Sequence, residues 1–112
     1  MSKPSPRHMR KRIQQDFASR GIVHGGLLLL SPEAALDFLD ECERRGLTLL
    51  GFDGFRREGE TAFFTEYMVD LSIREFANVS PIEKLDLARR FIQQRSHENI
   101  VFEMVVDDDE NG

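Results

Sequence analysis

The sequence predicts a two-layer α+β domain whose elements follow the order helix, then β-α-β-β-α-β. Two segments with apolar residues at helical spacing each begin with Ser-Pro, at Ser31 and at Ser80. Four other segments are short and either apolar throughout or alternately apolar and polar, which is typical of strands. The chain of 112 residues is 40% hydrophobic, so it is long and apolar enough to enclose one small core.

The N-terminal region divides into a predicted tail and a predicted helix. Residues 1–7 contain two prolines and little apolar material, and we expect a flexible tail there. In residues 8–20 the apolar side chains Met9, Ile13 and Phe17 recur every four positions among arginines and lysines. This spacing predicts a narrow, basic amphipathic helix, which needs another element to pack against.

The first β-α-β half follows this helix. Leu27–Leu30 is a short apolar run that predicts a buried strand. Ser31 can cap a helix, and the proline after it fits the first helical position. We expect that helix to run to about Arg45, because the next residue, Gly46, is of the type that commonly ends helices. Residues 47–55 form the second predicted strand.

The second half begins with a hairpin. A turn at residues 58–59 leads into a third strand at residues 61–71, where apolar and polar side chains alternate most clearly. A capping box that begins at Ser80 opens the second core helix, which we expect to end near residues 95–97. Residues 100–106 form the last predicted strand.

Two β-α-β halves joined by a hairpin form the split arrangement of ferredoxin-like domains. We therefore expect a ferredoxin-like fold or a close relative, with an extra N-terminal helix. Its four-stranded antiparallel sheet would carry two helices on one face. The predicted organisation is a single α+β domain over residues 8–106, followed by a frayed acidic tail at residues 107–112.

Composition excludes several classes of protein. A single cysteine, Cys42, cannot form an intramolecular disulfide, and its helical position predicts a buried thiol in a protein of a reducing compartment. The longest apolar run is far shorter than the roughly 20 residues that span a bilayer. No apolar segment typical of a secretory signal follows the basic N-terminus. These features predict a cytoplasmic protein that does not associate with membranes.

Charge is divided unevenly along the chain. Residues 1–20 hold six of the 15 lysines and arginines and one of the 20 acidic residues, whereas the net charge of the whole chain is −5. The molecule is therefore a basic arm on an acidic body. An acidic body repels polyanions, and the central strands lack the aromatic residues on which bases stack, so we do not expect nucleic acid to be a partner.

In a two-layer fold, the sheet face that the helices leave uncovered is the candidate interaction surface. If the even-numbered residues of 100–106 face the helices, then Val101, Glu103 and Val105 lie on this open face. Alternation in the third strand predicts further acidic and apolar residues there, and segment 51–55 adds a carboxylate. The predicted partner-binding residues are Glu66, Asp70, Glu103, Phe64, Met68 and Asp53.

Mixed acidic and apolar residues suit docking onto a basic protein, because charge steers the encounter and apolar anchors hold it. We therefore expect a non-enzymatic protein-interaction module, and one form of it is an immunity or inhibitor protein that masks a basic toxin or nuclease. The alternative is a homo-oligomeric ligand-binding or regulatory domain that pairs through the apolar residues of the open face.

Structural interpretations of the same residues remain open. The basic helix at residues 8–20 could fold over the open face and neutralise its carboxylates, and segment 51–55 could be a bulged strand with both phenylalanines in the core. His24 is expected to be an ordinary loop residue. No metal-ligand spacing, nucleophile elbow or phosphate-binding glycine loop is present, so we expect neither cofactor nor enzymatic activity.

Overall fold

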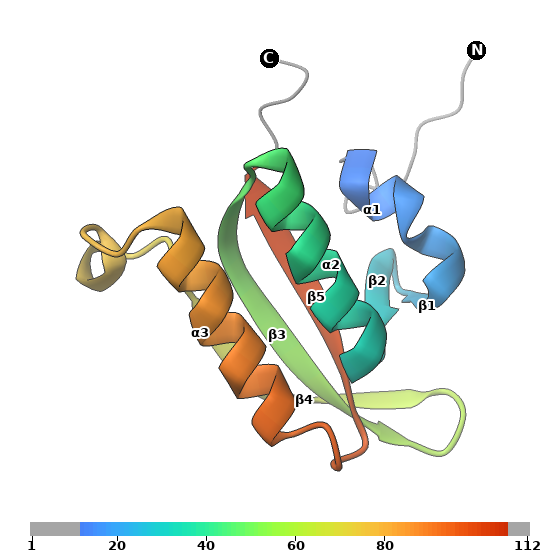
Figure 1. Cartoon of the computed structure of the whole chain (residues 1–112). Helices are drawn as coiled ribbons and strands as arrows, with labels where there is room; N and C mark the ends of the chain where they lie inside the picture. The colour runs from blue at the N-terminus through green and yellow to red at the C-terminus, as the bar shows by residue number, and fades with distance from the viewer. Residues whose placement is uncertain (1–11, 108–112) are drawn as a thin grey trace.

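A five-stranded antiparallel sheet is the centre of the computed structural model, which describes residues 12–107 (Figure 1). The strands are β1 (Gly21–His24), β2 (Leu27–Leu30), β3 (Thr48–Glu58), β4 (Ala62–Asp70) and β5 (Ile100–Asp107). The helices are α1 (Arg12–Asp16), α2 (Pro32–Arg45) and α3 (Pro81–Gln94), with short 3-10 turns η2 (Ala18–Arg20) and η3 (Arg74–Phe76). The helices α2 and α3 run side by side across one face of the sheet.

Both core helices begin and end as the sequence predicts. The Ser31 hydroxyl oxygen accepts a hydrogen bond from the backbone N–H of Ala34, and Gly46 ends α2 with a φ of 71°. At the start of α3, the capping box is complete. Ser80 accepts from the backbone N–H of Glu83, whose carboxylate accepts from the backbone N–H of Ser80. These caps satisfy backbone donors that helices otherwise leave unpaired.

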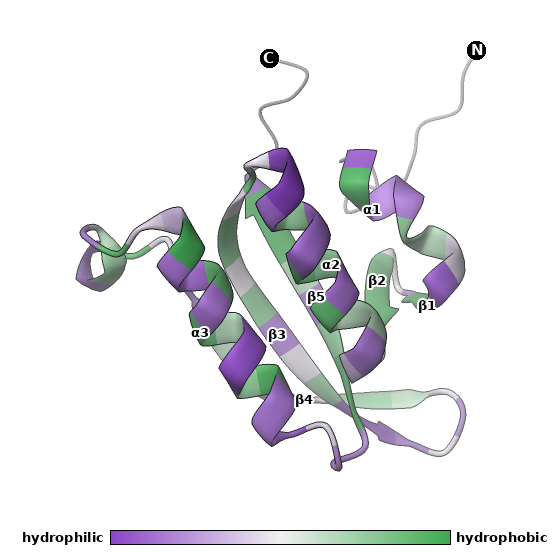
Figure 2. Ribbon diagram, in the orientation of Figure 1, coloured by the Kyte–Doolittle hydropathy of each residue, from purple (hydrophilic) through white to green (hydrophobic). Residues whose placement is uncertain are grey.

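The hydrophobic core lies between the helix layer and the sheet. Figure 2 shows that the outward faces of α2 and α3 are mostly hydrophilic. Phe38 and Leu39 of α2 and Phe102 of β5 all belong to this core, and Cys42 is also fully buried, as predicted. The alternation predicted for the last strand is confirmed, because its even-numbered residues, from Ile100 onward, belong to the core.

The strand order is β1-β2-β5-β3-β4, and it does not confirm the ferredoxin-like arrangement. The last strand, β5, lies in the middle of the sheet between β2 and β3. Most of β5 is buried on both of its faces, which is the environment of a central strand. An additional edge strand, β1, also enlarges the predicted four-stranded sheet to five strands.

The sequence analysis missed β1, which pairs with β2 in a short hairpin. Gly25 and Gly26 connect the two strands with φ values of 60° and 83°. Positive φ at both central residues is the geometry of a two-residue turn that matches strand twist, and glycine adopts it without strain. The two glycines therefore join β1 to β2. His24 therefore ends a strand and does not lie in a loop.

The predicted turn of the β3–β4 hairpin is confirmed, since Gly59 has a φ of 72° and lies between the two strands. The alternation predicted for the third strand is only partly correct. Opposite Gly54 and Phe55, β4 contains one extra residue, Glu66, so the register shifts by one. This β-bulge exchanges the two faces of β4 for every residue before it.

The sheet curls strongly at the end formed by the two hairpins. The rings of His24 in β1 and Phe63 in β4 lie 4.7 Å apart, although β1 and β4 are the opposite edges of the sheet. On the face away from the helices, the curl accounts for the burial of Leu29 and Val101, which are 1% and 8% exposed. The face that the helices leave uncovered is therefore concave, and only part of it is open.

The N-terminal helix does not lie over the open face. Ile13 of α1 is fully buried in the core, and the ring of Phe17 packs edge-on against Phe38 of α2 at 5.2 Å. Arg20 forms a 2.8 Å ion pair with Asp37, also in α2. The interpretation in which this helix covers the open-face carboxylates is thus wrong for the described part of the helix, which packs beside α2 (Figure 1).

The predicted tail at residues 1–7 lies outside the described residues, as do the first residues of the predicted helix and residues 108–112. Asp107, which we expected to begin the acidic tail, is the last residue of β5. Within the described part of the chain, no helix has the length and apolar character needed to cross a membrane.

Candidate functional site: an acidic patch on the open sheet face

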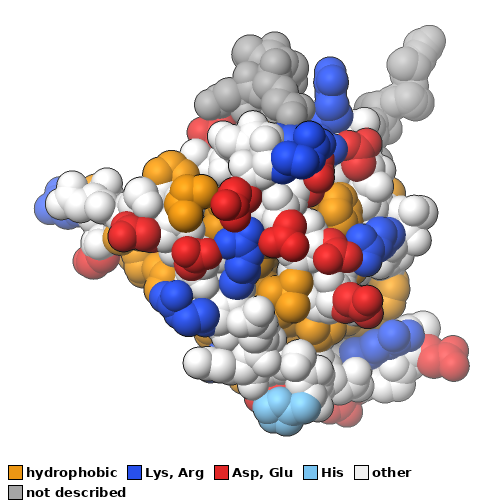
Figure 3. Space-filling model, in the orientation of Figure 1, with side chains coloured by type: hydrophobic (Ala, Val, Ile, Leu, Met, Phe, Trp, Pro, Cys, Tyr) orange, Lys and Arg blue, Asp and Glu red, His pale blue; other side chains and the backbone are white. Residues whose placement is uncertain are grey.

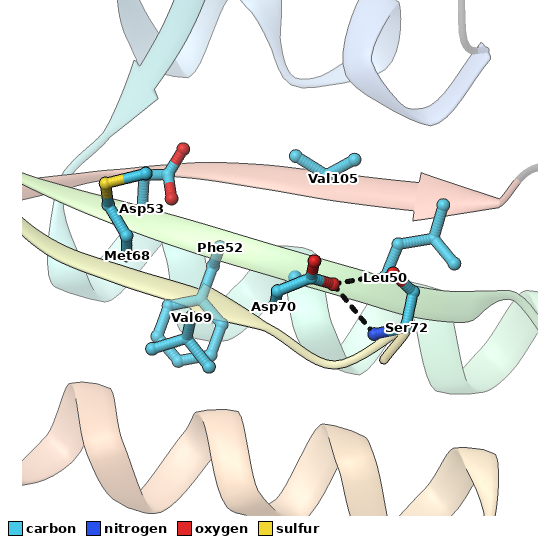
Figure 4. A pocket seen from close by; sticks show the side chains of 9 residues that line it. Leu50, Phe52, Asp53, Met68, Val69, Asp70, Ser72 and Val105 are labelled. Atoms are coloured by element: carbon cyan, nitrogen blue, oxygen red, sulfur yellow. Dashed lines mark hydrogen bonds between the residues drawn. The ribbon is translucent and has the colours of Figure 1, made fainter. Parts of the chain in front are cut away.

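The open face of the sheet contains a hollow of about 550 Å³ over β3, β4 and β5. Figure 4 shows that Asp53 and Met68 rise on the side away from α3, whereas Phe52 and Val69 point toward that helix. We define the acidic patch as the carboxylates and apolar side chains at and beneath this hollow. Its residues are Leu50, Asp53, Met68, Asp70, Glu103 and Val105.

Two carboxylates of the acidic patch are direct neighbours across adjacent strands. Asp53 of β3 is paired in register with Glu103 of β5, and residues paired in this way project from the same face of a sheet. Glu103 is only 6% exposed, so its carboxyl group lies beneath the surface, whereas Asp53 is half-buried at the hollow. Like charges directly opposite one another destabilise a strand pair.

Burial and neighbouring negative charges change the titration of this pair. Burial is the main cause that raises the pKa of Glu103 from 4.5 to about 7, and the negative charge of Asp53 adds to it. The pKa of Asp53 is also raised, first by burial and then by the charge of Asp70. The folded protein thus holds two carboxylates where their ionised forms are unfavourable.

Asp70 differs from this pair because the chain itself stabilises its charge. Its Oδ1 accepts a 2.9 Å hydrogen bond from the backbone N–H of Ser72 and a 2.6 Å bond from the Ser72 hydroxyl (Figure 4). These two bonds lower the pKa of Asp70. Asp70 is therefore a fixed negative charge at the rim of the hollow. Within residues 12–107, neither Asp53 nor Asp70 forms an ion pair with a lysine or arginine.

Apolar side chains surround the carboxylates of the acidic patch. Met68 is 77% exposed and Val105 is 38% exposed, and both line the hollow with Leu50. Leu50 reaches this position because it is the extra residue where the β3–β5 register shifts, between Leu49 and Gly51. Exposed Met and Val next to carboxylates make a surface of the mixed character found in protein interfaces.

The structure brings four of the six predicted residues together. Asp53, Met68, Asp70 and Glu103 belong to the acidic patch, although the sequence placed Glu103 at the surface and the structure buries it. Sequence reasoning missed Leu50 and Ser72. The extra residue that exposes Leu50 leaves no sign in the sequence, whereas Asp70 followed two residues later by a serine is a local pattern that could have indicated the hydrogen-bonded turn.

The other two predicted residues lie elsewhere. The bulge pairs Phe64 with Arg56, on the face of the sheet that also carries Ile100 of the core. Phe64 is 52% exposed at the tip of the hairpin, where the Arg56 guanidinium lies 5.8 Å from its ring. Glu66 is the bulged residue itself, and its carboxylate lies 3.3 Å from the same guanidinium.

The Gly51–Phe55 segment is part of a continuous strand. Phe52 is buried in the core, where its ring packs edge-on against Phe91 at 5.2 Å. Phe55 does not reach the core, because it pairs with Val101 on the opposite face of the sheet. The expectation that both phenylalanines lie in the core is therefore wrong. Gly54 leaves room for neighbouring side chains, since a Cβ there would meet the Tyr67 ring at 3.0 Å.

The helix layer provides an internal comparison for these charges. Arg89 of α3 contacts carboxylates of both helices, Glu43 and Asp86 at 2.6 Å and Asp40 at 3.0 Å. Arg45 is likewise paired with Asp16 and Glu41. Figure 3 shows the result, a face over which acidic and basic side chains are interleaved. Within the described residues, these helix carboxylates are therefore paired with arginine, in contrast to Asp53 and Asp70.

The chemistry open to the acidic patch is mainly the binding of a cationic group. A raised carboxyl pKa is also typical of general acids. Burial is the first cause that raises the pKa of both Asp53 and Glu103, and burial of this kind also disfavours their charged forms until a cation approaches. Among the residues that the structure describes, no group of three or more potential ligands could hold a metal ion.

No protein-family model matches this chain, and no curated protein or solved structure is significantly similar to it.

Proposed function

We propose that this chain is a non-enzymatic protein-interaction module whose acidic patch binds a basic segment of another protein. The observation that carries the proposal is the cross-strand pair Asp53–Glu103, held beside Asp70 and the exposed side chain of Met68. The fold keeps like charges together at a cost in stability, and a cationic side chain placed at the hollow would relieve that repulsion. The relief contributes to binding free energy.

The acidic patch also has the composition of an interface. Asp53 and Asp70 supply long-range attraction that steers a basic partner, and Met68 with Val105 supplies apolar contact. Glu103 is buried, so it adds negative potential from below and makes little direct contact. An immunity or inhibitor protein is one form of this function, because carboxylates can fill a cationic cleft that otherwise takes phosphates.

Self-association through the acidic patch is the alternative. A two-fold dimer places the same patch on both sides of the interface, so the carboxylates of one copy would face those of the other. Val101 is buried and Phe64 lies on the other face, which leaves fewer apolar residues for such a contact than the sequence suggested. The structure thus favours a partner of opposite charge.

The test immobilises the chain and exposes it to a lysate of the cells that naturally produce it. The amount of basic protein retained is measured at 20 and 500 mM NaCl. The patch variant Asp53→Asn/Asp70→Asn is compared with the control Glu60→Gln/Glu75→Gln, which removes the same charge from exposed positions elsewhere. We expect retention at low salt by the wild type and the control, and at least a roughly tenfold loss in the patch variant. Equal retention by the patch variant, or recovery of the chain alone, would contradict the proposal.

A further inference from the structure

The central strand β5 is paired unequally on its two sides. On one side, β3 pairs with the whole strand, from Ile100 to Asp107. On the other side, within the described residues, β2 pairs with β5 at a single position, Leu30–Phe102. The backbone of residues 103–107 therefore forms a strand edge inside the sheet, beyond the end of β2.

The amino-acid sequence of β5 makes such an edge hazardous. Residues 100–106 read IVFEMVV, and all of them except Glu103 are apolar. Segments of six or seven residues with high β propensity, low net charge and no proline pair readily with copies of themselves. An uncovered edge of β5 would therefore be a template for the same strand of another molecule.

The side chain of Gln14 in α1 covers this edge. Its Nε2 donates a 3.0 Å hydrogen bond to the Met104 carbonyl, a contact that a neighbouring strand would otherwise make. Gln14 is 6% exposed and Met104 is 2% exposed, so the contact is shielded from solvent. Figure 1 shows α1 on the side of β5 that lies away from β3.

The Gln14 amide uses only part of its hydrogen-bonding capacity. Its Oε1 is buried and accepts no hydrogen bond within residues 12–107. If an apolar residue such as methionine stood at this position, the Met104 carbonyl would be the unpaired acceptor in its place. The number of unpaired buried acceptors is the same in both cases, so the glutamine adds little to stability. What it changes is where the unpaired acceptor lies, on a side chain and not on the strand edge.

We infer that Gln14 closes the edge of β5 against β5 of a second copy of this chain. By occupying the Met104 carbonyl, the amide removes an acceptor with which an incoming strand would pair. Ile13 is fully buried, and the ring of Phe17 packs against Phe38, so α1 is held in place over the edge. The device acts on self-association and is independent of the proposed binding of a basic partner.

Self-association of Gln14→Met tests this inference. The substitution keeps the size of the side chain and removes the hydrogen bond to Met104. Gln15→Met is the matched control, because Gln15 is exposed on the same helix. Analytical ultracentrifugation over a concentration series measures the association. We expect Gln14→Met to associate roughly three- to tenfold more tightly than the wild type and the control, which corresponds to one hydrogen bond that the incoming strand no longer has to displace.

Two further measurements separate an open edge from a general loss of stability. The urea midpoint of Gln14→Met should equal that of the wild type, because one buried acceptor is unpaired in each. Val105→Lys adds a charge to β5 at a side chain that is 38% exposed, and charges on an edge strand hinder its pairing with another chain. Gln14→Met/Val105→Lys should therefore associate no more tightly than the wild type.

Each alternative result overturns the inference. Gln14→Met could associate no more tightly than the wild type, which would show that the amide does not close the edge. Gln15→Met could associate as tightly as Gln14→Met, which would assign the effect to added methionine. Gln14→Met/Val105→Lys could associate as tightly as Gln14→Met, which would place the contact away from β5.

Discussion

The helix layer and the acidic patch carry the same kinds of charge and treat them in opposite ways. On the helix layer, Arg89 contacts carboxylates of both helices, so that charges of opposite sign balance. In the acidic patch, Asp53 and Glu103 are cross-strand neighbours, and burial raises the pKa of both. Within residues 12–107 the helix layer thus pairs its carboxylates with arginine, whereas Asp53 and Asp70 of the acidic patch form no such pair.

This difference shows that the number of carboxylates on a surface is a poor guide to its role. Internal ion pairs use up the attraction that a charged face could offer to a partner, and exposed pairs add little stability. Carboxylates that are partly desolvated and crowded together keep that attraction available. The fold decides which carboxylates lie beside an arginine. Asp40 and Asp86 of the helix layer do so.

The largest expected effect comes from neutralising the buried member of the pair. Glu103→Gln should stabilise the protein by about 3 kcal/mol at pH 8, since one pKa unit corresponds to about 1.4 kcal/mol. The folded pKa of about 7 exceeds the ordinary value of 4.5. The folded state therefore binds more protons than the unfolded chain between these values, and wild-type stability falls as the pH rises through that window.

Urea denaturation of wild type and Glu103→Gln at pH 4 and pH 8 measures this effect. The gain should be present at pH 8 and nearly absent at pH 4, where the wild-type carboxyl group is protonated in both states. Glu60→Gln serves as the control and should change little at either pH. A variant that is less stable than the wild type at pH 8 would show that the charge of Glu103 does not destabilise the folded protein.

The next effect has the opposite sign and lies on the helix layer. Arg89→Met should lower the free energy of unfolding by about 1 kcal/mol at pH 7, because three carboxylates lose their shared partner. Arg90→Met is the matched control, since Arg90 is exposed on the same helix and forms no ion pair within residues 12–107. Equal stability of the two variants would contradict the contrast between the helix layer and the acidic patch.

Binding of a cationic ligand should depend on the protonation of Glu103. From pH 6 to pH 8 its carboxyl group passes from mostly neutral to mostly charged. The affinity of the protein for a cationic probe, a peptide of six arginines, should therefore rise by about threefold. Isothermal titration calorimetry at the two pH values measures the change. In Glu103→Gln the rise should be absent, and a rise of the same size would assign it to another group, such as a histidine.

The smallest effect on stability is expected at Met68 of the acidic patch. Met68→Ala removes a side chain that is 77% exposed, so the free energy of unfolding should change by less than about 0.5 kcal/mol. Retention of the basic protein should nevertheless fall, because Met68 is the most exposed apolar residue of the patch. Leu87→Ala on α3 is a control that should leave retention unchanged.

Local signals explain why the sequence predicts the helices well. Ser31, Gly46 and the capping box at Ser80 act within a few residues, and the structure confirms each of them. The two faces of the last strand also follow from simple alternation. The strand order was not predictable in this way, because it depends on which distant edges pair.

The acidic patch was predictable only in part, for two physical reasons. The one-residue bulge at Glu66 moves Phe64 to the other face, and nothing in the alternation of β4 marks its position. Glu103 is 6% exposed, although alternation along the strand predicts it at the surface, because burial also depends on packing between distant parts of the chain. Packing over such distances is invisible to a pattern of neighbouring residues.

The most direct test of the account is the titration of the Glu103 carboxyl group by NMR, in the wild type and in Asp53→Asn. We predict a wild-type midpoint near 7 and a lower midpoint in Asp53→Asn, because the variant removes the neighbouring negative charge. A midpoint near the ordinary value of 4.5 in the wild type would contradict the account, since the acidic patch would then hold its charges at no cost.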